Sequence, residues 1–127
     1  MSFGRFRDWL AEALDDLSAA EILLREGKYG KACFFSHQAS EKATKALMIY
    51  KFKRYDEIHS VAELLRRIQA PGELVEIGEQ LDRYYIPTRY PNAWPSGPPH
   101  THYRRDEAEK AVEAARRIIQ YVQDQLN

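Results

Sequence analysis

The sequence is poor in cysteine and has no long hydrophobic run. Its one cysteine, Cys33, excludes an internal disulfide and leaves too few thiolates for a zinc knuckle. No apolar segment approaches the roughly 18 residues that a transmembrane helix requires. Residues 1–5 lack the apolar core of a signal peptide. These absences predict a protein of the cytosol with no membrane association.

An excess of one charge is also lacking. Nineteen basic residues balance nineteen acidic ones, and the formal net charge is zero. Non-specific nucleic-acid binders usually carry a basic excess, so the overall charge argues against that role. Local basic pairs such as Arg116-Arg117 are typical of the solvated face of a helix.

The sequence contains no glycine-rich phosphate loop, no serine elbow and no acidic cluster that would hold magnesium. We therefore expect no metal and no cofactor. Cys33 stands among aromatic residues early in a helical segment, and we interpret it as a small core residue rather than a nucleophile.

Helical periodicity is what the sequence does contain, and no segment alternates as a strand does. A length of 127 residues is typical of one domain, so residues 1–127 are expected to form a single unit. The predicted helices span about 6–25, 29–52, 60–69, 73–88 and 106–126. The predicted fold class is all-α, an up-and-down bundle of four or five helices.

The helix predicted over 29–52 should lie at the centre of the bundle, because a stripe of small residues lets neighbouring helices approach closely. The stripe consists of Ala32, Ala39, Ala43 and Ala46. Gly27 is placed to end the preceding helix. Ser60 and Glu63 have the spacing of a capping box at the start of the helix over 60–69.

A polar stripe also runs along the helix over 29–52. His37, Glu41 and Lys45 are spaced by four residues, so they share one face and can pair in sequence. One interpretation is a base, an acid and a cation that converge on a ligand. The other is a salt-bridge ladder at the surface, with His37 hydrogen-bonded at the rim of the core.

Arg89 stands between the end of the helix over 73–88 and Tyr90-Pro91. In a structural interpretation, Tyr90-Pro91 stops the helix and Arg89 reaches back to Asp82 or Glu79. In a functional one, Arg89 binds a phosphate together with Tyr90. With His100 or His102 as a base, Arg89 would then suit cleavage of a phosphodiester, which needs a proton acceptor and a cation.

Residues 91–103 contain four prolines and a glycine, which exclude regular structure and indicate a functional or mobile loop. A further Arg–His pair, Arg54 and His59, is interpreted as mostly structural, because His59 stands where the next helix needs an N-terminal cap.

Three segments together resemble the HEPN family (higher eukaryotes and prokaryotes nucleotide-binding). They are GKYGKACFFSHQASEKATKAL at 27–47, HSV at 59–61 and YYIPTRYP at 84–91, in the family's order. The resemblance covers most of the chain. It implies a helical bundle that forms a homodimer and works with a small nucleotidyltransferase, often as a toxin–antitoxin couple.

Many HEPN proteins are metal-independent ribonucleases, with an arginine followed after four to six residues by a histidine near the start of the last helix. Here His100 and His102 lie farther from Arg89 than that pattern has them. Arg54 and His59 have the right spacing but stand between the second and third helices. The resemblance therefore also suits a chain that binds a nucleotide or presents a substrate to its partner.

Three hypotheses follow. The first is a homodimeric partner of a nucleotidyltransferase, in which His37, Glu41, Lys45, Arg89 and Tyr90 contact nucleotide or partner. The second is a ribonuclease toxin that uses Arg89 with His100 or His102. The third is a scaffold bundle without catalysis. The homodimer is also expected because Phe3, Trp94 and Tyr103 lie outside the helix stripes and need cover.

Overall fold

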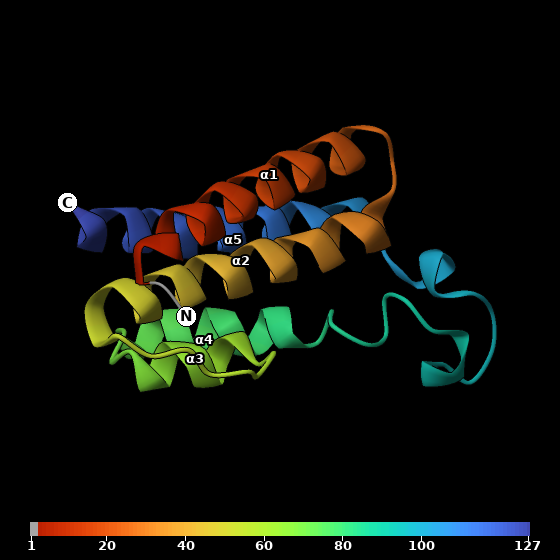
Figure 1. Cartoon of the computed structure of the whole chain (residues 1–127). Coiled ribbons are helices and arrows are strands. Elements are labelled where there is room, and N and C mark those ends of the chain that lie inside the picture. Colours follow the sequence, from red (N-terminus) through yellow and green to blue (C-terminus); the bar gives the residue numbers. More distant parts are fainter. Residues whose placement is uncertain (1–2) are drawn as a thin grey trace.

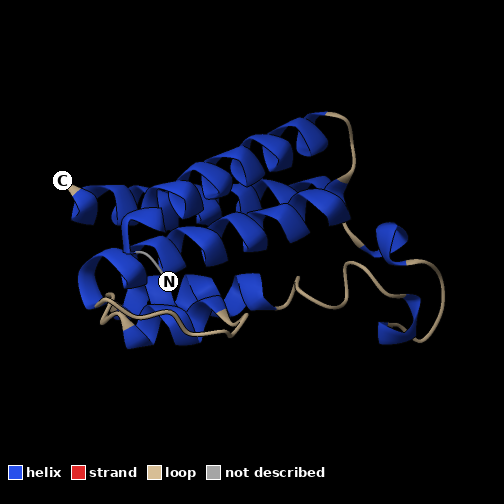
Figure 2. Ribbon diagram, in the orientation of Figure 1, coloured by secondary structure: helices blue, strands red, loops and turns tan. Residues whose placement is uncertain are grey.

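The computed structural model describes residues 3–127, which form helices joined by loops and turns, with no strand in that range (Figures 1 and 2). The helices are α1 (Phe6–Arg25), α2 (Tyr29–Phe52), α3 (Val61–Arg67), α4 (Gly72–Asp82) and α5 (Arg105–Leu126). Short 3-10 turns are η1 (Phe3–Arg5), η2 (Pro91–Ala93) and η3 (Pro99–His102). The all-α prediction is confirmed, and α1 and α2 have the predicted bounds. In residues 3–127 no helix has the length and apolarity needed to cross a membrane.

The centre of the bundle is α2, as predicted. It packs against α1 and α5 on one side and against the short pair α3 and α4 on the other (Figure 1). The four alanines of the predicted stripe are fully buried. Because these side chains are small, the neighbouring helices can approach the α2 backbone closely, and α2 can be buried on most of its faces.

The turn between α1 and α2 is formed by Gly27, as the sequence predicts. Gly27 has a φ of 79°, a left-handed conformation that costs glycine nothing because it has no Cβ. The backbone N–H of Lys28 donates to the Leu23 carbonyl at 2.8 Å, and that of Gly27 to the Leu24 carbonyl at 3.2 Å. This pair of bonds is the Schellman motif, which ends a helix and reverses the chain.

The end of α4 differs from the prediction. The periodicity predicts a helix to Thr88, but α4 ends at Asp82 and turns follow. Pro87 has no N–H to donate and disfavours helical geometry at the residue before it. Arg89 is consequently not at a helix end. It lies in a turn, where its backbone N–H donates to the Ile86 carbonyl at 3.1 Å.

Asp82 joins three helices. Its carboxylate accepts hydrogen bonds from the backbone N–H groups of Val61 (2.7 Å) and Ala62 (3.1 Å), the Ser60 hydroxyl (2.9 Å) and His37 Nε2 on α2 (3.1 Å). The first turn of α3 is thus capped by the last residue of α4. This matters because α3 has seven residues, too few for an isolated helix to be stable.

The predicted capping box is half formed. The Ser60 hydroxyl accepts a bond from the Glu63 N–H at 3.1 Å, as expected at an N-cap. The Glu63 carboxylate does not return to the Ser60 backbone, because it pairs with Arg66 and Arg67 of the same helix.

Residues 83–104, between α4 and α5, extend past one end of the bundle (Figure 1). Two of their aromatic side chains, those of Trp94 and Tyr103, pack within the chain. Tyr103 is 7% exposed and packs against Gly30, where an added Cβ would lie 3.0 Å from the ring. Trp94 meets Tyr103 edge-on and donates to the Pro87 carbonyl at 2.7 Å. These two residues therefore do not demand a dimer partner, contrary to the prediction; the Phe3 side chain lies outside the part that the structure describes.

Cys33 is buried on α2, in agreement with its interpretation as a core residue. Burial, with a smaller contribution from the charge of Glu107, raises the pKa of its thiol to about 12. At neutral pH the thiol is protonated, which excludes it as a nucleophile.

We predict that Asp82→Asn lowers the free energy of unfolding by about 2 kcal/mol, because the amide group of Asn presents a donor to the α3 N–H groups. Burial raises the pKa of Asp82, but its hydrogen bonds from His37, Val61, Ala62 and Ser60 hold it below its ordinary 3.8. A depressed pKa adds stability above the unfolded-state pKa, and that stability is lost as the pH falls through the folded-state value. Urea unfolding from pH 2 to pH 7 should therefore show a flatter acid limb for Asp82→Asn.

The matched control is Asp15→Asn on the exposed side of α1. It should leave both the unfolding free energy and the acid limb near those of the wild type. Equal stabilities for the two variants would contradict the role assigned to Asp82.

Candidate functional site

The polar stripe of α2 is buried. His37, Glu41 and Lys45 are 0%, 5% and 2% exposed, so the interpretation as a surface ladder is wrong. Of the two sequential pairs that the spacing allows, Glu41 and Lys45 form one, but His37 does not pair with Glu41. His37 instead contacts Asp82 through Nε2 and Gln38 through Nδ1, each at 3.1 Å. His37 therefore belongs to the junction of α2, α3 and α4.

Glu41 and Lys45 form a buried ion pair. Lys45 Nζ donates to Glu41 Oε2 at 2.9 Å. The same ammonium lies 5.8 Å from the centre of the Trp9 indole and 5.2 Å from that of the Tyr55 ring. The carboxylate and the faces of the two rings compensate the cost of burying this cation.

Glu41 also accepts a hydrogen bond from a surface histidine. His59 Nδ1 is 3.2 Å from each Glu41 carboxylate oxygen, and the His59 side chain is 55% exposed. The cap of α3 is Ser60, so the structural reason assigned to His59 from the sequence is wrong. Arg54, the arginine that precedes it at a similar spacing to the family pattern, pairs with Asp56.

Tyr85 links this histidine to Arg89. The His59 ring stacks on it at 4.9 Å between centres and 22° between planes. Arg89 Cζ is 4.6 Å from the centre of the Tyr85 ring. The centre of the buried His37 ring is 5.1 Å from that same centre. The sequence places Tyr85 in a motif but gives no sign that it would connect three functional candidates.

Arg89 is held by aromatic rings, not by a carboxylate. Its Nε donates to the Tyr85 carbonyl at 2.8 Å. Its Cζ is 4.7 Å from the centre of the Phe34 ring and 5.0 Å from that of Tyr90. The predicted contact with Asp82 or Glu79 is absent. No residue among 3–127 accepts a hydrogen bond from the two terminal nitrogens of this exposed guanidinium, which are available to an anion.

The loop histidines lie elsewhere. The His102 ring stacks on Trp94 at 4.0 Å and 4°, and its Nε2 is 2.9 Å from the Ser96 carbonyl oxygen. His100 lines a separate hollow of about 300 Å³ at the start of α2, beside Lys28 and Lys31. Within the described residues neither forms a hydrogen bond or a ring contact with Arg89, whereas His59 and Arg89 share Tyr85.

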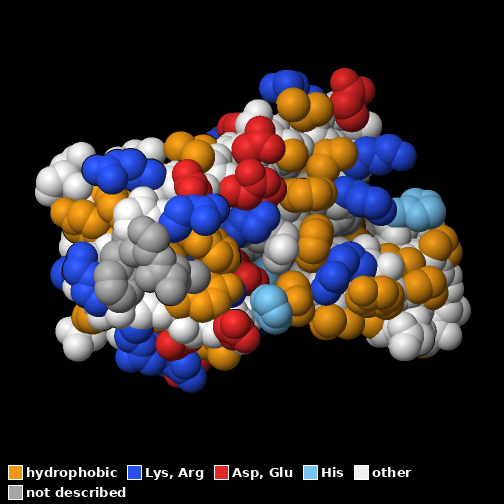
Figure 3. Space-filling model, viewed as in Figure 1, with side chains coloured by type: hydrophobic (Ala, Val, Ile, Leu, Met, Phe, Trp, Pro, Cys, Tyr) orange, Lys and Arg blue, Asp and Glu red, His pale blue; other side chains and the backbone are white. Residues whose placement is uncertain are grey.

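We call the surface around this arginine the Arg89 face. It comprises Phe34, His59, Tyr85, Ile86, Arg89 and Tyr90. Ile86 and Tyr90 are 48% and 46% exposed, so they add apolar surface beside the guanidinium. Basic and hydrophobic side chains gather on the side of the molecule where the start of α2 and the segment after α4 lie (Figure 3). A cation beside an exposed ring such as that of Tyr90 can bind a phosphate, while the ring can stack on a base.

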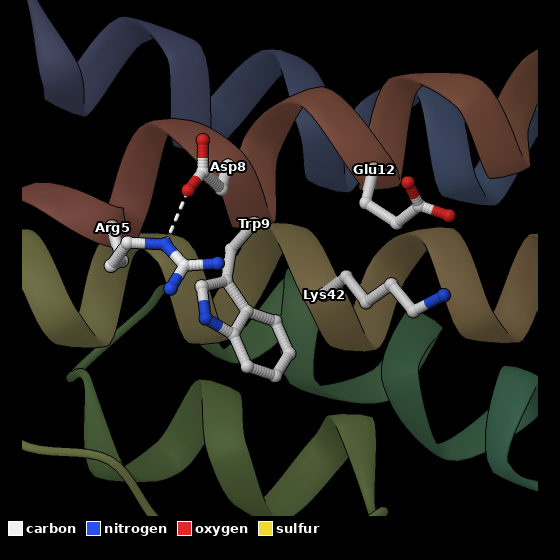
Figure 4. Close-up of a pocket in the computed structure, with 5 residues that line it drawn as sticks. All are labelled: Arg5, Asp8, Trp9, Glu12 and Lys42. Carbon is white, nitrogen blue, oxygen red and sulfur yellow. Dashed lines mark hydrogen bonds and ion pairs between the residues drawn. The ribbon is translucent and has the colours of Figure 1, made fainter. Parts of the chain in front are cut away.

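A second hollow, of about 370 Å³, is lined by Arg5, Asp8, Trp9, Glu12 and Lys42 (Figure 4). Its two cations are already paired, Arg5 with Asp8 and Lys42 with Asp16, the latter at 2.7 Å. The cations of this hollow are therefore less available to bind an anion than Arg89 is. In the described part of the chain, no group of three or more His, Cys, Asp or Glu side chains is placed to hold a metal ion.

We predict that Glu41→Ala lowers the free energy of unfolding by about 3–5 kcal/mol, because it leaves the Lys45 ammonium buried and unpaired. Glu41→Gln should cost only about 1–2 kcal/mol, because the amide oxygen can still accept from Lys45. Urea unfolding at pH 7 measures both. Equal losses for the two variants would mean that the ion pair does not determine the stability of this region.

Comparison with known proteins agrees with this architecture. The sequence model of the HEPN domain family matches residues 6–125 of this chain. The protein TT1696 of Thermus thermophilus is 42% identical, with 95% of this chain and 98% of that one covered and a TM-score of 0.90. ST0689, an archaeal HEPN homologue, is 32% identical over all of both chains, with a TM-score of 0.86.

Two further proteins are similar. A HEPN domain protein of Thermotoga maritima is 35% identical, covering 94% of this chain and 97% of its own, with a TM-score of 0.74. MJ1304 of Methanocaldococcus jannaschii, named as a candidate toxin, is 25% identical over 93% of this chain and 86% of its own length. The matched range and these identities show that the chain belongs to the HEPN domain family.

Proposed function

We propose that this HEPN protein binds the phosphate of a nucleotide or of RNA at the Arg89 face, acts as a homodimer and works in the cytosol with a minimal nucleotidyltransferase as a toxin–antitoxin pair. The observation that carries the proposal is the arrangement of Arg89. Its Nε is bound to the Tyr85 carbonyl, the residue is exposed, and no described residue accepts a hydrogen bond from its terminal nitrogens.

A guanidinium that is already oriented loses less conformational entropy when it meets an anion, and its two terminal nitrogens match two phosphate oxygens. The exposed Tyr90 ring beside it offers a surface on which a base can stack. The similarity to MJ1304 supports the toxin–antitoxin part of the proposal. The buried His37, Glu41 and Lys45 contribute from beneath this surface, through Tyr85 and His59.

We predict that Arg89→Ala weakens binding of a fluorescent RNA oligonucleotide by at least tenfold, because the phosphate loses a bidentate partner. Arg89→Lys should recover only a small part of the affinity, since an ammonium cannot form the paired contact. Fluorescence anisotropy gives the affinities, and thermal melting of the same samples shows whether the variants remain folded.

Arg83→Ala is the matched control, because Arg83 is an exposed arginine at the end of α4 and lies outside the Arg89 face. It should bind as the wild type does. An Arg89→Ala variant with undiminished affinity and a lower melting temperature would contradict the proposal and support the scaffold hypothesis.

Metal-independent RNA cleavage is a second candidate function. The specific observation in its favour is that His59, with Glu41 bound to its Nδ1, lies against the same ring as Arg89. Such an arrangement would supply a proton acceptor and a cation near one another, which supports His59 over the loop histidines as the base. Incubation of labelled RNA with the protein in EDTA tests this candidate; uncut RNA would exclude it.

For the homodimer, α1 is the better supported interface. Leu14 and Ile22 are 39% and 47% exposed and lie two helical turns apart, hence on one face. On α5, Arg116 pairs with Glu21 and Arg117 pairs with Glu73, so both arginines are engaged within the chain.

We predict that light scattering at micromolar concentration gives twice the 14.8 kDa mass of the chain. Ile22→Asp should shift the mass toward that of the monomer, because a carboxylate would be buried in the interface. A monomeric wild type would contradict the homodimer, and a dimeric Ile22→Asp variant would place the interface on another helix.

A further inference from the structure

We propose that the hollow at the junction of α1 and α2 binds a phosphate group, either as the free ion or as the ester of a small molecule. The hollow has a volume of about 300 Å³, at the lower end of the range of small-ligand sites. It shares no residue with the Arg89 face, so the inference goes beyond the proposed function. It follows from an excess of hydrogen-bond donors around one cavity.

The walls of the hollow come from two parts of the chain. One wall is the turn between α1 and α2 with the first residues of α2, from Glu26 to Lys31. The other is His100 in η3, which packs beside the start of α2. Basic side chains and a histidine lie together at this end of the molecule (Figure 3). The fold therefore adds a histidine from far along the chain to the lysines of the turn.

Two ammonium groups border the hollow without a carboxylate partner. Lys28 and Lys31 are both exposed, and neither forms an ion pair with any residue among 3–127. Glu26 is the one acidic side chain in the lining, and it forms no ion pair with either lysine. The positive charge of both lysines is therefore available to a ligand in the hollow.

Arg105, at the start of α5, determines the direction of the Tyr29 hydroxyl. Its Nε donates to the Tyr29 oxygen at 3.3 Å. A hydroxyl that accepts this bond directs its own hydrogen elsewhere, and no residue among 3–127 accepts that hydrogen. The oxygen lies over Gly27, where an added Cβ would be 3.9 Å from it. Because Tyr29 and Gly27 both line the hollow, the hydroxyl is a free donor at its border.

The chemistry of these groups indicates the class of ligand. The lysine ammoniums can only donate, the Tyr29 hydroxyl has a free hydrogen, and the His100 ring has an N–H in either tautomer. Such a set requires an anion with several acceptor oxygens. The oxygens of a phosphate point in tetrahedral directions and can meet donors from separate walls, whereas both oxygens of a carboxylate lie in one plane. Lysine is also a common phosphate ligand in proteins.

The test is a titration of the nitrogen-15-labelled protein with sodium phosphate at constant ionic strength. The amide signals of Gly27 and Gly30 report on this place, because both glycines line the hollow. In the wild type their shifts should saturate at millimolar phosphate. Acetate at the same ionic strength should produce no saturating shift, since a planar carboxylate does not match the donors.

The variants remove the donors one kind at a time. Lys28→Ala combined with Lys31→Ala should weaken phosphate binding by about tenfold or more, because both ammoniums are lost. Tyr29→Phe keeps the ring and removes the O–H, and should weaken binding by about threefold. Lys110→Ala is the matched control, at an exposed lysine of α5 outside the hollow, and should bind as the wild type does. Thermal melting of the same samples shows that each variant is folded.

A parallel titration with glycerol 3-phosphate distinguishes the two sources of the phosphate group. Tighter binding of the ester would assign the hollow to a phosphorylated small molecule, and tighter binding of inorganic phosphate would assign it to the free ion. Shifts that do not saturate in the wild type, that acetate reproduces, or that persist undiminished in the double lysine variant would overturn the inference. An equal loss in Lys110→Ala would also overturn it, because the effect would then be one of general charge.

Discussion

The Asp82 carboxylate is the constraint on which the arrangement of this bundle depends. It accepts hydrogen bonds from the first N–H groups of α3, from the Ser60 hydroxyl and from His37. These bonds fix α2, α3 and α4 relative to one another. A seven-residue helix has little stability of its own, and its capping from another element determines where it starts. His59 immediately precedes that capped turn. The position of the surface histidine is therefore set by an interaction in the interior.

Buried charge in α2 is the second constraint. Lys45 and Glu41 compensate each other, and the Trp9 and Tyr55 rings surround the ammonium. Replacing such a pair by apolar residues often costs no stability, so its presence suggests a role beyond holding the core together. Here the carboxylate extends the network outward to His59. The interior charge pair therefore sets the hydrogen-bonding character of a group at the surface.

The sequence was sufficient for the parts of the fold that local rules govern. Gly27 marked the end of α1, and the alanine stripe marked α2 as the central helix. The end of α4 was missed because Tyr84 and Tyr85 continue the helical periodicity, while Asp82 is engaged in capping a turn 21 residues earlier.

The segment around Arg89 was enough to mark this residue as a candidate for the site. His59 was set aside because only the tertiary structure brings it to Glu41, 18 residues away, and to Tyr85. His100 and His102 are nearer to Arg89 in sequence than His59 is, but His102 stacks on Trp94 and His100 lines a separate hollow.

Arg89 stabilises a turn through one nitrogen, while no described residue accepts a hydrogen bond from its other two. Its Nε is bound to the Tyr85 carbonyl, so this part of the guanidinium stabilises the turn. The three aromatic rings around Cζ orient the guanidinium and leave its charge in place, whereas a carboxylate would neutralise that charge. Binding an anion then requires no ion pair to be broken first. Because Tyr85 both contacts Arg89 and stacks on His59, a change at this ring would disturb both side chains together.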